Sequence, residues 1–492
     1  MQEYSEENIR LIFGLKLNQL RTERRLSPQE LSQKAGLSVS YLNEIEKGKK
    51  YPKQDKILAL ASALDVSYDQ LVSLRLTKNL SPITQLLASD FIKEIPFDTF
   101  GIEKQKLLEM IARAPLKVSA FISTILEIAR NYNLKTEHFY FAALRSYQEM
   151  HDNYFEEYEE EAERFRQEYQ LTQNPITNDD LLSLLSQTFK VKVEQKDFSG
   201  FEYLKSFRVI TLPASQPSHM LINQALNEQQ AAFYYAREIA FHYLAITDRP
   251  YTASWLKVQS FETLLNNFRA SYFAGCVLIP KAKLIEDLEA FFKQETWDPE
   301  AFIKLSKNYN ASLEMFLHRL TNILPKYFGI NQLFFIRYSQ DTQSESGRVL
   351  TKELHLARSS GRFNMNVSEH LYRRYLTNRV LSYLEKKRIN QNYLATAIRT
   401  RYHEKGSEYF CISILNPPSE LSNNDHSLNI GFVITDAIKN KISFLKDSNI
   451  YYLKPEEEFL NRISAPEEIL LQMQRKATEE ELDSLYKSFS PK

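Results

Sequence analysis

The sequence predicts a mainly α-helical protein of several domains, with smaller α+β regions in its second half. Glycine is scarce, at 11 of 492 residues, and Leu, Glu, Lys, Phe and Tyr recur at the three- and four-residue spacing of amphipathic helices. Short, alternating β-branched runs begin near residue 191 and become frequent after residue 331. A chain of this length exceeds one ordinary hydrophobic core, so we expect about two to four domains.

Net charge and cysteine content exclude several classes of protein. Lys plus Arg equals Asp plus Glu, at 62 each, so a uniformly basic nucleic-acid coat is excluded and any DNA contact needs a local basic patch. Cys276 and Cys411 lie far apart, which argues against a disulfide framework or a Cys-rich metal site. The N-terminus has no signal-peptide pattern, and no run of about eighteen apolar residues occurs. We therefore expect a cytoplasmic protein without a membrane segment.

Changes in composition divide the chain into four predicted segments. The stretch from Thr77 to Pro96 contains several Ser, Thr and Pro residues, which indicates a linker, and Asn174-Pro175 gives a second break. At Asn331 strand-like runs replace helical ones. The expected domains are a small helical bundle at residues 8–74, a helical connector at 80–172, an α+β domain at 176–330, and an α+β domain with an antiparallel sheet at 331–492.

Periodicity predicts the main elements within these segments. The connector is expected to end in one long helix, which starts near Glu137 and continues through the acidic run Glu156–Glu163, a solvated face. In the third segment we expect a helix at DLLSLLSQTF, strands at VKVEQ and FRVITL, and helices at residues 227–246, 254–275 and 283–325. In the fourth, the predicted strands are QLFFIRY, LTKELHLAR, YFCISIL, LNIGFVIT and KISFLKD.

Two short helices with a tight turn between them are predicted near the N-terminus. The run SPQE at residues 27–30 contains a complete capping box and starts a helix that ends at Lys34. Gly36 supplies the positive φ that a sharp turn needs, and Ser38 caps a second helix, Val39 to Lys47. The inward residues are expected to be Leu31, Ala35, Leu37, Leu42 and Ile45.

The outward residues of this helix pair suit contact with duplex DNA. A recognition helix needs short polar side chains near its start for base edges, and cations beside it for phosphates. Residues 9–56 contain eleven Lys or Arg against five Asp or Glu, so a chain that is neutral overall is basic here. The predicted DNA-binding residues are Gln29, Ser38, Ser40, Tyr41, Asn43, Lys47, Lys49 and Lys50.

The segment LSPQELSQKAGLSVSYLNEIEKGKKYP resembles the core of the XRE, or Cro/CI-type, helix-turn-helix family. The resemblance implies a helical bundle that binds a double-stranded DNA operator, and we expect a homodimer because one such bundle buries little DNA. In this family the positions of Arg21 and Glu46 often hold an internal ion pair, and the position of Val39 often holds a contact residue. The alternative is a small helical protein-interaction module.

The runs EQQAAFYYAREIAFHYLAI and FETLLNNFRASYFAGCVLIP resemble the two core helices of the ImmA/IrrE metallopeptidases. Active members hold zinc with the histidines of H-E-x-x-H and a third ligand from the second helix, and the Glu is the general base. Here the histidine positions hold Arg237 and Phe241, the base position Glu238 and the third position Asn267. His242 comes one residue after the second position, about 100° around the helix. The resemblance implies a peptidase-like domain without metal ligands or catalysis.

The order of the segments resembles the short-chain fatty acyl transcriptional regulators, with likeness in ALRSYQEMHDNYFEE, SWLKVQSFETLLNNFRASYFAG and YNASLEMFLHRLTNILPKYFGI. This resemblance implies a sensor of acyl-CoA esters, with cations around the phosphates and an apolar slot for the acyl chain. Some members bind a metal or iron–sulfur cluster through C-terminal cysteines, but YYLKPEEEFLNRISAPEEI has none, so no cofactor is expected. The predicted ligand residues are Arg237, Glu238, Arg269, Lys352, Arg358, Arg373 and Arg374, with Tyr234, Phe273, Phe334 and Phe335 in the slot.

These patterns together predict a dimeric, sequence-specific, DNA-binding transcriptional regulator of the cytoplasm and nucleoid that responds to a metabolite such as a short-chain acyl-CoA. One alternative is a zinc metallopeptidase that acts on a partner repressor. Another is a toxin-antitoxin or phage-type regulator whose partner is a protein. The expected fold is mainly α and multidomain, with a helix-turn-helix bundle, a helical linker domain, an α+β ImmA/IrrE-like domain and an α+β C-terminal domain with an antiparallel sheet.

Overall fold

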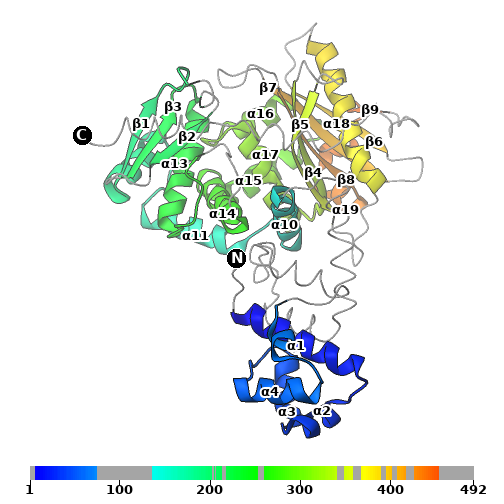
Figure 1. The fold of residues 1–492 in the computed structure, drawn as a ribbon. Coiled ribbons are helices and arrows are strands. Elements are labelled where there is room, and N and C mark those ends of the chain that lie inside the picture. The colour runs from blue at the N-terminus through cyan, green and yellow to red at the C-terminus, as the bar shows by residue number, and fades with distance from the viewer. Residues whose placement is uncertain are drawn as a thin grey trace. The chain divides into compact units, whose positions relative to one another are not determined.

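A computed structural model gives the fold of two compact units, Met1–Ala142 with Ser260–Glu262, and Ala143–Gln259 with Thr263–Lys492 (Figure 1). The predicted linker at 77–96 and the predicted ligand residue Arg358 lie outside the described residues. The structure describes residues 6–74, 136–201, 204, 207–212, 218–252, 260–340, 348–357, 367–388, 395–401, 407–416 and 426–453.

In the first unit, short helices form the predicted bundle around one apolar core. The core is built from fully buried side chains of different helices, among them Leu17, Leu31, Leu42 and Leu60. The two predicted helices are confirmed to within one residue at their ends, because capping residues fix where they begin. The helices are α1 (Glu6–Glu23), α2 (Pro28–Ala35), α3 (Val39–Glu46), α4 (Gln54–Ala63) and α5 (Tyr68–Val72).

The predicted long connector helix is two helices, so that expectation was wrong. Helix α10 (Thr136–Met150) ends before α11 (Glu156–Glu168), and both Asp152 and Asn153 between them have positive φ, at 51° and 53°. The buried Asn153 amide donates a hydrogen bond to Thr321 Oγ1 at 2.9 Å. Tertiary contacts therefore hold a turn where periodicity alone favours a continuous helix.

The acidic face of α11 is also less exposed than predicted. Glu159 is 1% exposed and forms two hydrogen bonds with the buried guanidinium of Arg319, at 2.5 and 2.7 Å. Tyr272 donates a third, at 2.9 Å. Burial raises the pKa of Glu159, but the Arg319 charge and these hydrogen bonds outweigh it and leave the pKa below its ordinary value. One member of the run is thus a structural anchor.

A three-stranded sheet and two core helices follow. The strands are in the order β1-β3-β2, with β1 parallel and β2 antiparallel to β3. Strand β3 was not predicted, because its buried residues Met220–Ile222 form an apolar run too short to separate from a loop. The elements are α12 (Asn178–Ser183), the π-helical turn η2 (Leu184–Thr188), β1 (Val191–Lys196), β2 (Val209–Leu212), β3 (Ser218–Asn223), α13 (Glu228–Tyr243) and α14 (Phe261–Leu278).

The C-terminal part contains the predicted antiparallel sheet, in the order β5-β4-β8-β7-β6-β9, where only the short β6–β9 pair is parallel. The elements before and within it are α15 (Lys281–Phe292), α16 (Pro299–Ser306), α17 (Leu313–Ile323), η3 (Leu324–Phe328), β4 (Gln332–Gln340), β5 (Arg348–Ala357), α18 (Val367–Arg388), β6 (Ala395–Arg401), β7 (Glu408–Asn416), β8 (His426–Ile434) and β9 (Tyr451–Leu453).

The predicted strand KISFLKD is wrong. This segment holds the end of α19 (Asp436–Lys441) and the 3-10 turn η4 (Ser443–Lys446). The Thr435 hydroxyl accepts a hydrogen bond from the amide of Ile438, and Asp436 lies in the first turn, so capping competes successfully with the β-like alternation. Helix α18 and strands β6 and β9 were not predicted.

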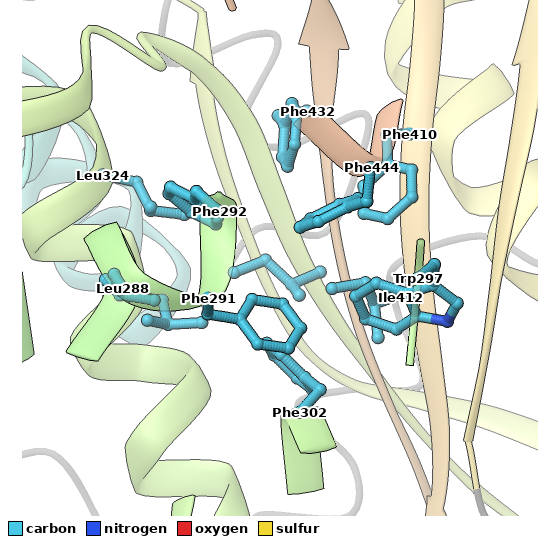
Figure 2. A pocket seen from close by; sticks show the side chains of 12 residues that line it. Leu288, Phe291, Phe292, Trp297, Phe302, Leu324, Phe410, Ile412, Phe432 and Phe444 are labelled. Atoms are coloured by element: carbon cyan, nitrogen blue, oxygen red, sulfur yellow. The ribbon is translucent and has the colours of Figure 1, made fainter. Parts of the chain in front are cut away.

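The six-stranded sheet is covered on both faces. Helix α18 packs on one face through Tyr372, Leu376 and Val380. The other face meets α15, α16 and α17 in an aromatic layer, which encloses a cavity of about 20 Å³ (Figure 2). This volume holds about one water molecule, so the cavity is a packing defect of the core rather than a ligand pocket. Its lining is Leu288, Phe291, Phe292, Trp297, Phe302, Leu320, Leu324, Phe410, Ile412, Ile430, Phe432 and Phe444.

Candidate functional site

Helix α3 approaches α1 closely because two glycines leave room for it. A Cβ atom on Gly14 of α1 would lie 2.3 Å from the carbonyl oxygen of Ile45, and one on Gly48 would lie 3.0 Å from the Cα atom of Leu11. The turn before α3 needs the positive φ of Gly36, at 62°, as predicted. Close contact between the two backbones therefore fixes the position of α3 against α1, independently of polar contacts between side chains.

Side-chain caps define where α2 and α3 begin. Ser27 Oγ accepts a hydrogen bond from the amide of Glu30 at 3.2 Å, and Glu30 Oε2 accepts one from the amide of Ser27 at 2.6 Å. This is the predicted capping box, and its hydrogen bonds lower the pKa of Glu30. Ser38 Oγ accepts a hydrogen bond from the amide of Tyr41 at 3.2 Å. Ser38 keeps its hydroxyl proton for a second partner.

A partly buried ion pair ties the end of α3 to α1. Arg21 Nε lies 2.6 Å from Glu46 Oε1, and Arg21 Nη2 lies 2.9 Å from Glu46 Oε2, which confirms the pair that the family resemblance implied. Asn18 donates a further hydrogen bond to Glu46 at 2.7 Å, and Arg21 donates one to the Leu26 carbonyl at 2.9 Å. The two residues serve the bundle and do not face outward.

The side of α2 and α3 that faces away from the core is polar and basic. Gln29, Ser38, Ser40, Lys47 and Lys49 are exposed there. They combine hydrogen-bonding groups short enough to reach base edges with ammonium groups that suit phosphates.

Tyr41 and Asn43 are less exposed than we expected, whereas Lys50 is exposed but paired. The Tyr41 ring is half-buried against the core of the bundle, because its position in α3 lies beside Leu42 at the edge of the packed face. Asn43 is partly exposed. Lys50 pairs with Glu44 at 2.8 Å, and its ammonium lies 5.8 Å from the centre of the Tyr41 ring. Tyr41 and Lys50 thus have protein partners as well as solvent access.

In the second unit, the residues at the peptidase-ligand positions do come together, and we call Arg237, Glu238, Phe241 and Asn267 the Arg237 site. Arg237 Nη1 donates a hydrogen bond to Asn267 Oδ1 at 3.3 Å, and the Arg237 guanidinium lies 5.9 Å from the centre of the Phe241 ring. A second guanidinium, Arg249, stacks on the same ring at 4.2 Å. Cationic groups therefore surround the position where a metal would need anionic or neutral donors.

Glu238 of the Arg237 site is engaged by its neighbours. Arg249 Nη2 donates to both of its carboxylate oxygens, at 2.7 and 2.8 Å, and His242 Nε2 lies 3.3 Å from Oε1. Burial raises the pKa of Glu238, but the His242 hydrogen bond and the Arg249 charge outweigh it, so the pKa lies below its ordinary value. The neighbours of this carboxylate thus favour its charged form. Sequence reasoning missed Arg249, which lies outside both motif helices.

Charged residues extend from the Arg237 site toward the six-stranded sheet. Arg208 donates a hydrogen bond to Tyr234 Oη at 3.3 Å, and the Tyr234 ring in turn lies 4.9 Å from the Arg237 guanidinium. Nearby, Glu314 of α17 pairs with Lys352 of β5 and lies 3.5 Å from Arg337 Nη1 of β4. Arg208, Arg337 and Glu314 were not predicted, because only the tertiary fold brings these strands and helices together.

The arginines among the remaining predicted ligand residues contact other neighbours. Arg269 donates a hydrogen bond to Asn266 at 2.9 Å. Arg374 forms two hydrogen bonds with Glu353, at 2.8 and 2.7 Å. Arg373 is 1% exposed and lies between the Phe334 and Tyr409 rings, each at 5.6 Å. Each of these three arginines thus has local contacts of its own, and their role in ligand binding stays a prediction.

The predicted aromatic slot is not assembled either. Phe334 and Phe335 are neighbours on strand β4 and so point to opposite faces of the sheet. Phe334 belongs to the cluster under α18, whereas the Phe335 ring lies 4.3 Å from His318 of α17. Phe273 packs instead on Phe165, at 5.6 Å. These rings are ordinary core, and only Tyr234 of the four borders the Arg237 site.

Within the described residues, no three His, Cys, Asp or Glu side chains lie close enough together to hold a metal ion. None of the helices described here combines the length and the hydropathy of a membrane-spanning segment.

A capped helix pair with an exposed basic face, in one chain with a peptidase-like pair of helices, defines a helix-turn-helix regulator with an added domain. Residues 17–71 match the model of the helix-turn-helix family, and residues 187–321 match that of the IrrE N-terminal-like domain. The HTH-type transcriptional regulator y4dJ of Sinorhizobium fredii is 33% identical over 66 residues, which are 13% of this chain and 86% of that protein. The chain belongs to the HTH-type transcriptional regulators.

Two solved structures are also similar. The restriction-modification controller protein C.AhdI from Aeromonas hydrophila is 37% identical, over 13% of this chain and 94% of that chain, with a TM-score of 0.13. A Mycobacterium tuberculosis transcriptional regulator is 16% identical, over 66% of this chain and 92% of that chain, with a TM-score of 0.45.

Proposed function

We propose that this chain is a sequence-specific DNA-binding regulator of transcription whose DNA affinity changes when a small metabolite binds its second unit. The exposed polar and basic face of α2 and α3 carries the first part of the proposal. Ser40 and Asn43 suit base edges, and Lys47 and Lys49 suit phosphates. The Arg21–Glu46 pair holds that face in one geometry.

A pair of substitutions tests the assigned face. Asn43→Ala should weaken binding to the selected operator and leave binding to a scrambled duplex nearly unchanged, because it removes a base contact. Lys49→Ala should weaken both and reduce the slope of log affinity against log salt by about one. Fluorescence anisotropy with an operator obtained by in vitro selection measures both effects. Lys304→Ala, which removes an exposed lysine of α16, is the control. If Asn43→Ala and Lys49→Ala both bind like the wild type, the assigned face is wrong.

We further propose that two copies of the chain bind one operator. A single helix-turn-helix buries little DNA, and two-fold half-sites one helical turn apart are the usual solution. Sedimentation of the chain with a labelled operator should give two chains per duplex, and a protected site should show two half-sites. A saturated complex with one chain per duplex would contradict the dimer.

The peptidase-like domain is proposed to act as a sensor and not as an enzyme. The support is chemical, because a guanidinium, a phenyl ring and an amide stand at the ligand positions, and Glu238 is engaged by Arg249. The competing function is a zinc metallopeptidase that cleaves a partner repressor. Elemental analysis of the purified chain separates the two, since tightly bound zinc at one atom per chain would overturn the sensor.

The metabolite proposed on family resemblance is a short-chain acyl-CoA. A ligand at about a hundredfold its dissociation constant stabilises the folded state by roughly 2.7 kcal/mol, which a thermal-shift experiment detects. We expect such a shift with an acyl-CoA ester and a change in operator affinity at the same concentration. A toxin-antitoxin or phage-type regulator with a protein partner would show neither effect.

A further inference from the structure

Helix α3 carries an exposed carboxylate on the face that we assign to DNA. Glu44 lies four residues after Ser40 and three before Lys47, so the three side chains share one side of the helix. The Glu44 side chain is 40% exposed, whereas Glu46, the other acidic residue of α3, is buried in its pair with Arg21. A negative charge at this place repels the DNA phosphates unless another contact compensates it.

Glu44 engages Lys50 through both its side chain and its backbone. Lys50 Nζ lies 2.8 Å from Glu44 Oε2, and the ammonium lies 5.8 Å from the centre of the Tyr41 ring. The Glu44 carbonyl accepts hydrogen bonds from the amides of Lys49 and Lys50, at 2.9 and 3.3 Å. Lys50 is therefore occupied in the protein without DNA, although its side chain is 56% exposed. An exposed pair of this kind is weak, so a DNA phosphate can compete for the ammonium at little cost.

The major groove offers this carboxylate one kind of hydrogen-bond partner. Each base pair presents a single amino group there, on cytosine or adenine, and its other polar groups are acceptors. A carboxylate accepts hydrogen bonds and cannot donate them. Glu44 is therefore satisfied by the DNA only where the sequence brings an amino group to it, and elsewhere its best partner is Lys50.

We infer that Glu44 is a specificity-determining residue that acts by holding or releasing Lys50. At the operator, the Glu44 carboxylate accepts a hydrogen bond from a cytosine or adenine amino group, and Lys50 is released to a phosphate. On other duplexes Glu44 keeps Lys50, and the complex has one phosphate contact fewer. This inference rests on the proposed DNA-binding function. It adds to the base contacts a contact that is withheld from the wrong DNA.

The salt dependence of binding to a scrambled duplex tests this exchange. Glu44→Ala releases Lys50, so the slope of log affinity against log salt should steepen by about one and the affinity should rise about two- to fivefold. Glu44→Ala combined with Lys50→Ala should return the slope to the wild-type value. Asp69→Asn is the matched control, because it removes an exposed carboxylate of the same unit outside α2 and α3. Fluorescence anisotropy with the full chain measures all four proteins.

The selected operator should respond in the opposite direction. Glu44→Ala should bind it about five- to hundredfold more weakly, because a base contact is lost. Operators in which purine replaces one adenine, or pyrimidinone replaces one cytosine, lack a single amino group. One of these replacements should weaken binding by the wild type and not binding by Glu44→Ala, which identifies the base that Glu44 contacts.

Four results would overturn the inference: an unchanged scrambled-duplex slope in Glu44→Ala, a rise in its operator affinity, an equal steepening in Asp69→Asn, or no amino group whose removal affects the wild type alone. Operator selectivity that survives Glu44→Ala sinks the inference and leaves the DNA-binding function standing. A wild type that binds its selected operator no better than the scrambled duplex sinks the proposed sequence-specific function itself.

Discussion

The two charged regions of this protein place their cations in opposite environments. Lys47 and Lys49 are exposed on the helix-turn-helix, whereas Arg237 is only 7% exposed, as is the side chain of the neighbouring Arg249. Exposed ammonium groups keep their hydration, so they cost little folding free energy. Salt screens their interactions with charges more than about 10 Å away. Buried guanidinium groups are expensive unless they are paired, but they hold a fixed geometry. The first arrangement suits reversible contact with a polyanion, and the second forms a fixed network of internal charges.

The largest expected effect is at the buried carboxylate. Glu238→Ala leaves Arg249 and Arg237 without their nearest negative charge, so the free energy of unfolding should fall by about 3–5 kcal/mol. Urea denaturation of the second unit measures it. Glu44→Ala, which removes the partner of Lys50 in the exposed region, should change stability by less than about 0.5 kcal/mol. Similar values for the two variants would abolish the contrast between the regions.

The second-largest effect expected is a pH dependence of stability caused by the buried side chain of His355. Burial lowers the pKa of His355 from 6.5 to about 4, with Arg373 and Arg374 adding to the effect against Glu353. Between pH 4 and pH 6.5 the unfolded chain therefore binds a proton at His355 that the folded chain does not. For this reason the His355 contribution leaves the free energy of unfolding undiminished above pH 6.5 and lowers it progressively toward pH 4. The loss should reach about 3 kcal/mol. His355→Phe should reduce the slope of this part of the profile without abolishing it, because the pKa of His318 is also lowered to about 4. An unchanged slope in that variant would contradict the assignment.

An ion pair inside the helix-turn-helix should give an intermediate effect. Arg21 and Glu46 have side chains 12% and 8% exposed, so Arg21→Ala should destabilise the bundle by about 2 kcal/mol and weaken operator binding. The double variant Arg21→Met with Glu46→Leu should recover most of the stability, because no buried charge remains unpaired. Thermal unfolding and anisotropy titrations measure the two effects. No recovery in the double variant would show that the pair matters for shape and not for charge.

The smallest effect is expected at the rim of the DNA-binding face. Lys50 is 56% exposed in its pair with Glu44, so Lys50→Ala should cost less than about 0.5 kcal/mol of stability. If Lys50 contacts a phosphate, the salt slope of operator binding should still fall by about one. An unchanged slope would show that Lys50 contacts only Glu44 and Tyr41 and no phosphate.

Local chemistry made the helix-turn-helix predictable. The capping box at Ser27 and Glu30, the turn at Gly36 and the cap at Ser38 are each decided by residues within a few positions of one another. The sequence also placed strands β4, β5, β7 and β8 of the antiparallel sheet, because alternation over several residues is a local signal. Where local signals conflicted, prediction failed, as at the 151–155 turn and at the segment KISFLKD.

The sequence by itself determined the helix-turn-helix of this regulator. It also revealed that the peptidase-ligand positions hold Arg237, Phe241 and Asn267. It did not determine the neighbours of those residues. Arg249 and Arg208 come from different segments, and only the packing of the second unit brings them beside Arg237, with Glu314 beside Arg208. The physical reason is that caps and turns depend on adjacent residues, whereas the field inside a folded unit depends on which distant charges share its low-dielectric interior.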